Sequence, residues 1–371
     1  MIDEYFITTA YNTMERGFPE FRKRKRKLAG RFVLKNFIHI FKFKAEQTDA
    51  KKFLLHPAQE IQKIFVDVVK LDINNSPFLN KALFYLQLGY ISPSIGIRLW
   101  AARKGYRYLQ HYFKSGNITI LNCGPSILSP FLAKLCEDKN DDSRYYIIQH
   151  GFYQLDYKPY DFEFKIAACR SIIWSDLLAQ NYISLGMAPE KIHVLPTHLF
   201  RELKKLNISH KVLIIGESLN KINPDFDREY GQKVLQIINY LKRNSKYNEF
   251  YFKKHPRALP SVKLDLALKT NSVKFTEKIN LNDYGLVIGA VSTLMIEAMA
   301  EGCRVLQLSL EEFSSLNIGN YSIYTSAENI QDIEQTTEKF TTLNNLQKNY
   351  INSEYLRIDN NFEDYYKRLI N

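Results

Sequence analysis

A basic turn with one histidine is the part of the chain best suited to chemistry on a phosphate. Lys253, Lys254, His255, Pro256 and Arg257 follow the strand-like run EFYF. Proline ends a strand because it has no N–H to give to the sheet. The cations stabilise negative charge, and a histidine can give a proton or a hydrogen bond to a departing phosphate oxygen. This pattern predicts a site for a phosphate-bearing ligand, and the alternative is a plain basic surface turn.

Two more loops of this kind follow strand-like runs in the same half of the chain. Gly216, Glu217 and Ser218 come after VLII, where a glycine lets the backbone approach a phosphate or ribose. Ser292 and Thr293 follow YGLVIGA and begin the helical run LMIEAMAEG. Hydroxyls and amides at a helix start either cap the helix or bind an anion. All three loops are therefore candidate parts of one nucleotide site.

A carboxylate follows the third loop. Glu297 lies one turn into the helix and off the capping-box spacing from Ser292. We therefore expect it to bind a sugar or ribose hydroxyl, and the alternative is a surface carboxylate close to a favourable helix start.

Two α/β units must position these loops. NITILNC and YYIIQHG are strand-like and flank the helical run SILSPFLAKLCED, and a second alternation runs from KVLIIGESL to CRVLQLS. Such alternation is typical of parallel sheets with helices on their faces. We expect an α/β protein with an acceptor-binding domain over 1–205, helical over 1–115 and α/β over 116–205. A nucleotide-sugar-binding domain over 206–345 and a C-terminal helix over 346–371 complete the prediction.

Composition excludes several classes of protein. The 371 residues are 45% apolar and 24% charged, which is typical of a globular chain with two domains. No apolar run is long enough to cross a membrane, and the first residues lack the pattern of a secretory signal. The four cysteines are scattered without a CxxC spacing, so we expect reduced core residues in a cytoplasmic protein. They are Cys123, Cys136, Cys169 and Cys303.

The net charge of +12 is concentrated near the N-terminus, where residues 22–35 carry eight positive charges and no acidic residue. We expect this stretch to contact anionic lipid or an acidic glycan acceptor, which would place the protein peripherally on the inner face of the cell membrane. A solvated helix face is the alternative. Nucleic acid is not an expected partner, because no RNA- or DNA-binding motif accompanies the charge. The predicted contacts are Arg22, Lys23, Arg24, Lys25, Arg26 and Lys27.

The motifs KKHPR and VSTLMIEAMAEGCRV resemble the His-Pro and Ser/Thr motifs of bacterial GT-B glycosyltransferases that use CMP-activated sialic acid or related keto-sugars. VLIIGESL resembles the opening of their nucleotide domain, and the resemblance covers residues 211 to about 310. It implies two Rossmann-like domains and an inverting transfer that requires no metal and no cofactor. It also implies that His255 assists departure of the CMP phosphate, which Ser292 and Thr293 bind.

At the position of the general base, this sequence differs from the motif of that family. Its members carry two acidic residues followed by glycine after a strand of the N-terminal domain, where this chain has Gln149, His150 and Gly151. A histidine can act as base, since its ordinary pKa of ~6.5 is close to working pH, so we predict His150. A histidine that ends a buried strand by binding backbone is the alternative. Nearby carboxylates could act instead: Asp156, Asp161 and Glu163. His193 and His198 are expected to be structural.

The predicted function is transfer of sialic acid or a related keto-sugar from a CMP-activated donor to a bacterial surface glycan of a capsule or lipooligosaccharide. The His-Gly pair also resembles transferases that move glycerol or ribitol phosphate from CDP-polyols to a teichoic-acid-like polymer, and some Kdo transferases. A UDP-sugar transferase or 2-epimerase is a third alternative. A non-catalytic protein that binds an anionic polymer or lipid is the alternative from another class, and stabilisation by a nucleotide separates it from the enzymes.

Overall fold

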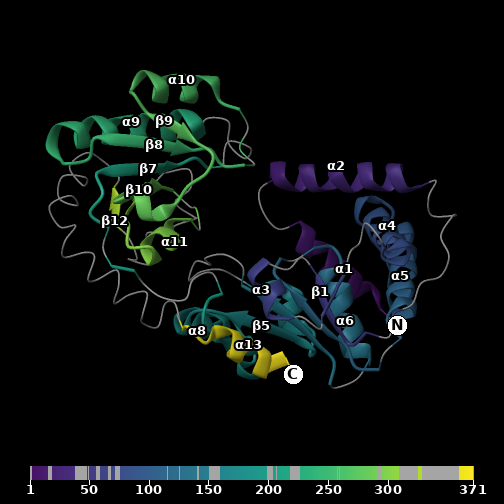
Figure 1. Cartoon of the computed structure of the whole chain (residues 1–371). Coiled ribbons are helices and arrows are strands. Elements are labelled where there is room, and N and C mark those ends of the chain that lie inside the picture. Colours follow the sequence, from purple (N-terminus) through teal and green to yellow (C-terminus); the bar gives the residue numbers. More distant parts are fainter. Residues whose placement is uncertain are drawn as a thin grey trace.

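Two parallel sheets, each with helices packed against it, make up the computed structural model (Figure 1). The structure describes residues 2–15, 19–37, 48, 50–55, 59–65, 68–71, 76–114, 116–124, 126–139, 142–149, 159–198, 204–205, 207–217, 226–256, 258, 260–290, 292, 294–308, 325–327 and 359–370. Each sheet belongs to one domain, and together they confirm the predicted α/β class with two Rossmann-like units.

The N-terminal sheet has the strand order β2-β1-β3-β4-β5-β6, and every neighbouring pair is parallel. Its strands are β1 (Lys52–Leu55), β2 (Val69–Lys70), β3 (Thr119–Asn122), β4 (Arg144–Ile148), β5 (Cys169–Ile173) and β6 (Ile192–Val194). β1 and β2 lie inside the stretch that the sequence predicts to be helical, so that prediction is wrong there. KFLL is a short buried run, and periodicity cannot separate a strand from a helix over four residues.

Helices cover both faces of this sheet because its strands alternate buried side chains. Phe53 and Leu55 face one cluster, while Leu54 between them faces the other. The first cluster includes residues of α1 (Glu4–Met14), α2 (Pro19–Asn36), α4 (Pro77–Ile91), α5 (Ile95–Tyr112) and α6 (Ser129–Lys139). The second includes residues of α3 (Gln59–Ile64) and α13 (Phe362–Ile370). The remaining helical segments of the domain are α7 (Asp161–Lys165), α8 (Asp176–Ser184) and η2 (Pro189–Lys191).

The C-terminal sheet has the order β12-β11-β10-β7-β8-β9 and is also parallel throughout. Its strands are β7 (Lys211–Ile215), β8 (Glu249–Lys253), β9 (Lys274–Thr276), β10 (Leu286–Gly289), β11 (Arg304–Leu308) and β12 (Thr325–Ala327). α9 (Phe226–Asn244) and α10 (Val262–Thr270) pack on one face through a shared apolar cluster. η4 (Leu281–Asp283) precedes β10, and α11 (Leu294–Ala300) connects β10 to β11.

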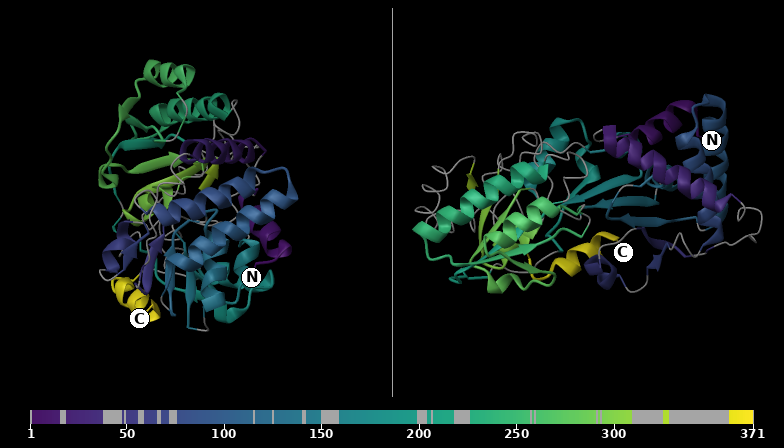
Figure 2. Two further views of the ribbon diagram at one scale, coloured as in Figure 1. Left: turned by 90° about the vertical axis from the view of Figure 1, so that its right-hand side faces the viewer. Right: turned by 90° about the horizontal axis from the view of Figure 1, so that it is seen from above.

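The final helix belongs to the first domain. α13 packs against α3 and the N-terminal sheet (Figure 2), and it buries Phe362, Tyr366 and Ile370 there. The hydroxyl of Tyr146 on β4 donates to the carbonyl oxygen of Leu369 at 3.4 Å. The chain therefore visits the C-terminal domain and returns, which couples the two ends of the sequence.

The segment that enters the second domain lies against the amino ends of β10 and β11. Lys204 N–H donates to the Ala300 carbonyl oxygen at 2.7 Å, and Asn207 N–H donates to that of Gly302 at 2.9 Å. Gly302 has φ +85°, and a Cβ there would lie 2.1 Å from the carbonyl oxygen of Lys205. Only glycine fits this position, so the close approach of the linker depends on it.

Two expectations from composition can be compared with the described residues. Each of the four cysteines is free and buried, as predicted. Within the described ranges, no helix has both the length and the apolar character of a membrane span.

Candidate functional site

The three predicted loops follow neighbouring strands. β8, β7 and β10 are adjacent, with Ile215 paired to Lys253 and Ile214 paired to Ile288, so their carboxyl ends meet at one edge. From β7 the chain moves outward to β8 on one side and later to β10 on the other. Ligands of doubly wound sheets bind where the strand order reverses in this way. The strand edge at β7 and β10 is therefore the candidate site.

Gly216 brings the loops after β7 and β8 into contact. Its N–H donates to the Lys253 carbonyl oxygen at 2.8 Å. A Cβ at this position would lie 2.8 Å from Phe252 Cζ, 3.0 Å from the Lys253 carbonyl oxygen and 3.2 Å from Lys254 Cα. Any larger residue would push the two loops apart, so this glycine sets the shape of the strand edge.

Glu217 joins the loop after β7 to the end of β10. It is buried, and its Oε1 accepts a hydrogen bond from the backbone N–H of Ala290, just after β10, at 3.0 Å. The sequence predicts a nucleotide contact for this carboxylate, whereas the structure gives it a bond that ties two loops together. Beneath it the hydroxyl of Tyr230 on α9 donates to the Ile215 carbonyl oxygen, and burial, followed by the charges of Glu217 and Asp227, raises the pKa of Tyr230.

Glu217→Ala is expected to lower the free energy of unfolding by about 2 kcal/mol, because it leaves the buried Ala290 N–H without this acceptor. Urea denaturation of this variant beside Glu277→Ala, which removes an exposed carboxylate, measures the difference. Unchanged stability together with loss of nucleotide binding would instead mean that Glu217 contacts the ligand directly.

Two lysines of the basic turn bind other residues of the C-terminal domain. Lys253 Nζ donates to the Glu277 carbonyl oxygen at 2.8 Å, and Lys254 Nζ forms an ion pair with Asp265 Oδ2 on α10 at 2.9 Å. His255 is half-buried, and its carbonyl oxygen accepts from Ala258 N–H at 2.9 Å, which closes the turn. The turn is thus built on two lysines that bind their own domain.

The sequence missed the two residues that support this edge from the helices. Asp265 pairs with Lys254 from α10, and Tyr230 holds the end of β7 from α9. Both stand in ordinary amphipathic helices, where no local pattern marks them. Their partners lie 11 and 15 residues away, a separation that only the packing of helix on sheet brings into contact.

The remaining residues of the turn and the third loop are described only in part. Pro256 is exposed, while Arg257, Thr293 and Ser218 lie outside the described residues. Ser292 Oγ accepts from Leu294 N–H at 3.3 Å, and its carbonyl oxygen accepts from Met295 N–H at 3.1 Å. Ser292 thus caps the start of α11, which is one of the two roles predicted for it. The other role, binding an anion, stays a prediction.

Glu297 lines a separate hollow of ≈ 370 Å³. Its other walls include Lys204 from the linker, Asn280 and Asn282 from the segment around η4, and Glu301 at the end of α11. Among the described lining residues of this hollow, none belongs to the basic turn or to the loop after β7. A role for Glu297 at a sugar or ribose hydroxyl stays a prediction.

The predicted base of the N-terminal domain lies outside the described residues, as do Gly151 and Asp156. The residue before it, Gln149, is buried, and its Oε1 accepts from Trp174 N–H at 2.9 Å. Gln149 therefore anchors the chain where it leaves β4, directly before His150. Because β4 lies inside the sheet, this end of the strand points toward the edge where a ligand would bind.

The carboxylates offered as alternative bases differ in exposure. Glu163 is buried, with Oε1 accepting from Tyr160 N–H at 2.8 Å and Oε2 accepting from Ser171 Oγ at 2.9 Å. Both of its oxygens are used to start α7 and to hold β5, which argues against Glu163 as base. Asp161 is exposed in the first turn of the same helix.

Both histidines expected to be structural lie among aromatic rings. His193 on β6 lies 6.1 Å from the ring of Tyr146, and burial, together with the charge of Arg170, lowers its pKa. His198 is buried, with ring centroids 5.2 Å from Trp174 and 6.3 Å from Tyr366 of α13.

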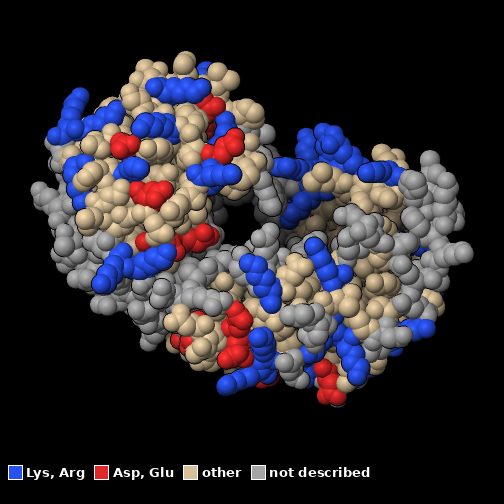
Figure 3. Space-filling model, viewed as in Figure 1, with Lys and Arg blue, Asp and Glu red and all other residues tan. Residues whose placement is uncertain are grey.

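The basic stretch forms α2, which packs on α4. Lys25 Nζ donates to the Met14 carbonyl oxygen at 3.1 Å, and Arg26 binds Glu15 Oε1 at 2.8 Å. Arg22 is half-buried. The other three predicted contacts are exposed, and lysine and arginine side chains gather over this helix (Figure 3). They are Lys23, Arg24 and Lys27.

Comparison with known proteins places the fold. No protein-family model matches the chain, and no curated protein matches it. Among solved structures, it is similar to a protein from Listeria monocytogenes assigned as a UDP-N-acetylglucosamine 2-epimerase, at 13% identity and a TM-score of 0.52, covering 94% of this chain and 93% of that one. It is also similar to MnaA from S. aureus in a co-structure with UDP, at 12% identity and a TM-score of 0.51, covering 86% and 98%. The chain therefore has the GT-B fold of two Rossmann-like domains.

Proposed function

We propose that the chain is a nucleotide-sugar transferase whose donor is a CMP-activated sialic acid or related keto-sugar and whose acceptor is a bacterial surface glycan. One observation carries the proposal: His255 and Gly216 stand at the ends of the paired strands β8 and β7, beside the reversal of strand order. A phosphate at this strand edge would lie beside the loop that follows Gly216 and the imidazole of His255. The resemblance of the two motifs to transferases of CMP-sugars supports the choice of donor.

The reaction would proceed by one displacement. The acceptor oxygen forms a bond to the anomeric carbon as the bond from that carbon to the phosphate oxygen breaks, and CMP leaves. The acceptor proton passes to a base of the N-terminal domain, for which His150 is our candidate. His255 stabilises the charge growing on the phosphate, assisted by Ser292, Thr293 and Arg257. No metal or cofactor enters this proposal.

A second candidate is chemistry on a UDP-sugar, either transfer or 2-epimerisation. It is favoured by the fold likeness to MnaA, which was solved with UDP. Both candidates use the same strand edge. They differ in the nucleobase of the donor, which is cytosine in one and uracil in the other. A CDP-polyol phosphotransferase differs again, because it transfers a phosphate and so needs a second phosphate site near His150.

A nucleotide panel tests the proposal. Melting temperature is measured with CMP, CDP, UDP and GDP at equal concentrations, since a ligand at 100 times its Kd stabilises by about 2.7 kcal/mol. We expect CMP to raise the melting temperature most. If UDP raises it most, the CMP-sugar proposal fails and the UDP-sugar candidate takes its place; if no nucleotide raises it, the chain is a binding protein with a nucleotide-binding fold.

Attachment to the inner face of an anionic membrane through α2 is part of the same proposal. The exposed Lys23, Arg24 and Lys27 make no hydrogen bond or ion pair with the described residues. Each cation near an anionic surface contributes about 1 kcal/mol to membrane binding. Exposed Leu28, 54% accessible, lies on the same helix and would enter the headgroup layer.

A further inference from the structure

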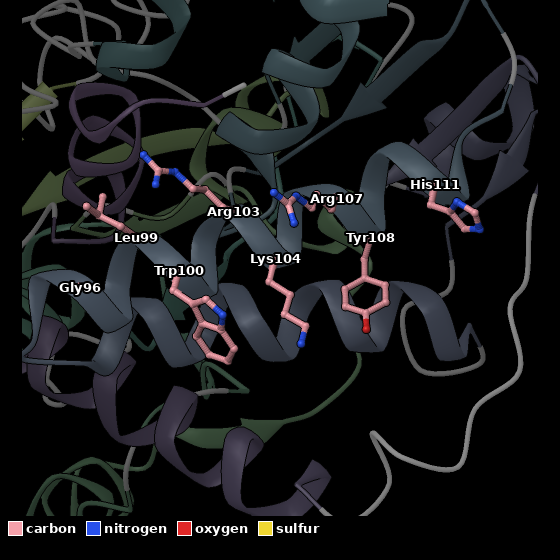
Figure 4. A pocket seen from close by; sticks show the side chains of 8 residues that line it. All are labelled: Gly96, Leu99, Trp100, Arg103, Lys104, Arg107, Tyr108 and His111. Carbon is pink, nitrogen blue, oxygen red and sulfur yellow. The ribbon is translucent and has the colours of Figure 1, made fainter.

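A groove of ≈ 860 Å³ runs along α5, in a part of the N-terminal domain that the proposed reaction does not use (Figure 4). The described residues that line it lie on one face of this helix, because they follow one another in the sequence at alternating intervals of three residues and one residue. From Trp100 to His111 the groove is roughly 17 Å long, at 1.5 Å per residue. We call it the α5 groove and define it by Trp100, Arg103, Lys104, Arg107, Tyr108 and His111.

Aromatic rings along the groove are held in place from α4. Tyr85 on α4 stacks on Tyr108 with ring centroids 5.6 Å apart, and it meets Trp100 edge to face, also at 5.6 Å. Lys104 Nζ lies 5.0 Å from the Tyr85 ring and 5.3 Å from the Trp100 ring. Trp100 nevertheless remains 51% exposed. The groove therefore offers a rigid aromatic surface whose ordering costs little on binding.

Positive charge lies beside these rings, and the Nε of one of the cations, Arg103, donates to the carbonyl oxygen of Ile2 at 3.4 Å. On this face Arg103 and Arg107 form one row and Trp100, Lys104 and Tyr108 form the adjacent row, and the two rows diverge (Figure 4). Arg107 is exposed and makes no hydrogen bond or ion pair with the described residues. Residues 73–136 contain seven lysines and arginines and no aspartate or glutamate. The stretch that forms α4 and α5 is therefore basic throughout, and an acidic ligand would complement its charge.

We propose that the α5 groove binds an acidic polysaccharide. The exposed ring of Trp100 would pack against the apolar face of a sugar ring, with Tyr108 beside it, and the guanidinium groups would bind carboxylates or phosphates of the same polymer. Arginine suits this role because its planar fork matches both anions. A long, concave groove fits an extended polymer, whereas a bilayer is met by a projecting surface such as α2.

The position of the groove gives it a role in acceptor binding, and this role rests on the proposed function. α5 lies at the end of the N-terminal domain far from the C-terminal domain (Figures 1 and 2). A polymer in the groove would therefore be held away from its reacting end. Long acidic acceptors should then bind more tightly than short ones with the same terminal sugar.

Affinity electrophoresis tests the binding directly, in gels that contain polysialic acid, glycerol-phosphate teichoic acid or neutral dextran. These probes present carboxylates, phosphates or no charge. We expect at least one acidic polymer to retard the full-length protein, and dextran to leave it unretarded. The proposal is overturned if neither acidic polymer retards the protein, or if dextran retards it equally.

Variants locate the site. Arg107→Ser and Trp100→Ala/Arg107→Ser should each weaken binding, the double variant by at least tenfold, while Lys263→Ser, which removes an exposed charge from α10, should not. Arg107 is exposed, so its single variant should fold even if the double one does not. Polymer binding that survives Arg107→Ser and the double variant, or that is lost only in Lys23→Ser/Arg24→Ser/Lys27→Ser, would refute the assignment to α5.

Flotation with phosphatidylglycerol vesicles separates a polymer from a membrane. The α5 variants should bind vesicles as the unmodified protein does. If they lose vesicles and keep polymer, the groove is a membrane surface and the proposal is wrong. The nucleotide panel is independent of both assays: no nucleotide shift with intact polymer binding refutes the transferase alone, and the converse refutes the groove alone.

Discussion

His255→Ala is expected to lower turnover of the activated sugar by about 10²- to 10³-fold, because the departing phosphate loses its hydrogen-bond and proton donor. The side chain is half-buried at the end of β8. Its contribution to the turn is made by the backbone, since the His255 carbonyl oxygen accepts from Ala258 N–H. Alanine keeps that bond, so the melting temperature without ligand should change little while the shift caused by the preferred nucleotide shrinks.

Steady-state kinetics with the donor chosen by the nucleotide panel measure this effect. His210→Ala is the matched control, because it removes an exposed histidine that precedes β7. The two histidines stand at opposite ends of paired strands that are five residues long, and these strands span about 17 Å at 3.3 Å per residue. Equal activity of the two variants would contradict the role given to His255.

Tyr366→Ala is expected to lower the free energy of unfolding by about 3–5 kcal/mol, the usual cost of removing a buried aromatic ring. The Tyr366 side chain is fully buried. Its ring lies 6.3 Å from those of His198 and Phe362, within the cluster that joins α13 to the N-terminal sheet. Loss of this ring would leave a cavity where the end of the chain meets its first domain.

Urea denaturation followed by circular dichroism measures the change. The neighbouring Tyr365→Ala is the control, because that side chain is 43% exposed and makes one surface hydrogen bond, to Asp359 Oδ2 at 3.3 Å. We expect its free energy of unfolding to stay within about 0.5 kcal/mol of the unmodified protein. Similar losses in both variants would mean that α13 does not depend on its buried face.

The elements of the C-terminal domain could be predicted because their signals are local. VLII and LVIG are apolar runs that form buried strands, and EFYF forms a strand whose side chains alternate between buried and half-buried. α9 shows the periodicity of a helix with one apolar face, and that face meets the sheet. Such patterns depend only on neighbours in sequence, so they can be read without knowing the fold.

KFLL shows where local reading fails. A lysine followed by three apolar residues fits a strand or a helix equally well, and pairing with β3 in the register Lys52 to Thr119 decides between them. The strand forms because two clusters, one on each face, both bury its side chains. That information lies more than sixty residues away in the sequence.

By itself, the sequence determined the α/β class, the loops that end β7, β8 and β10, and the concentration of charge in α2. Tertiary structure decided that these three strands are neighbours, that Glu217 bonds to Ala290, and that Lys254 pairs with Asp265. It also decided that α13 returns to the first domain and that Tyr85 of α4 stacks on Tyr108 of the α5 groove. Local propensity follows from nearby residues, whereas these contacts exist only because burial of apolar faces brings distant segments together.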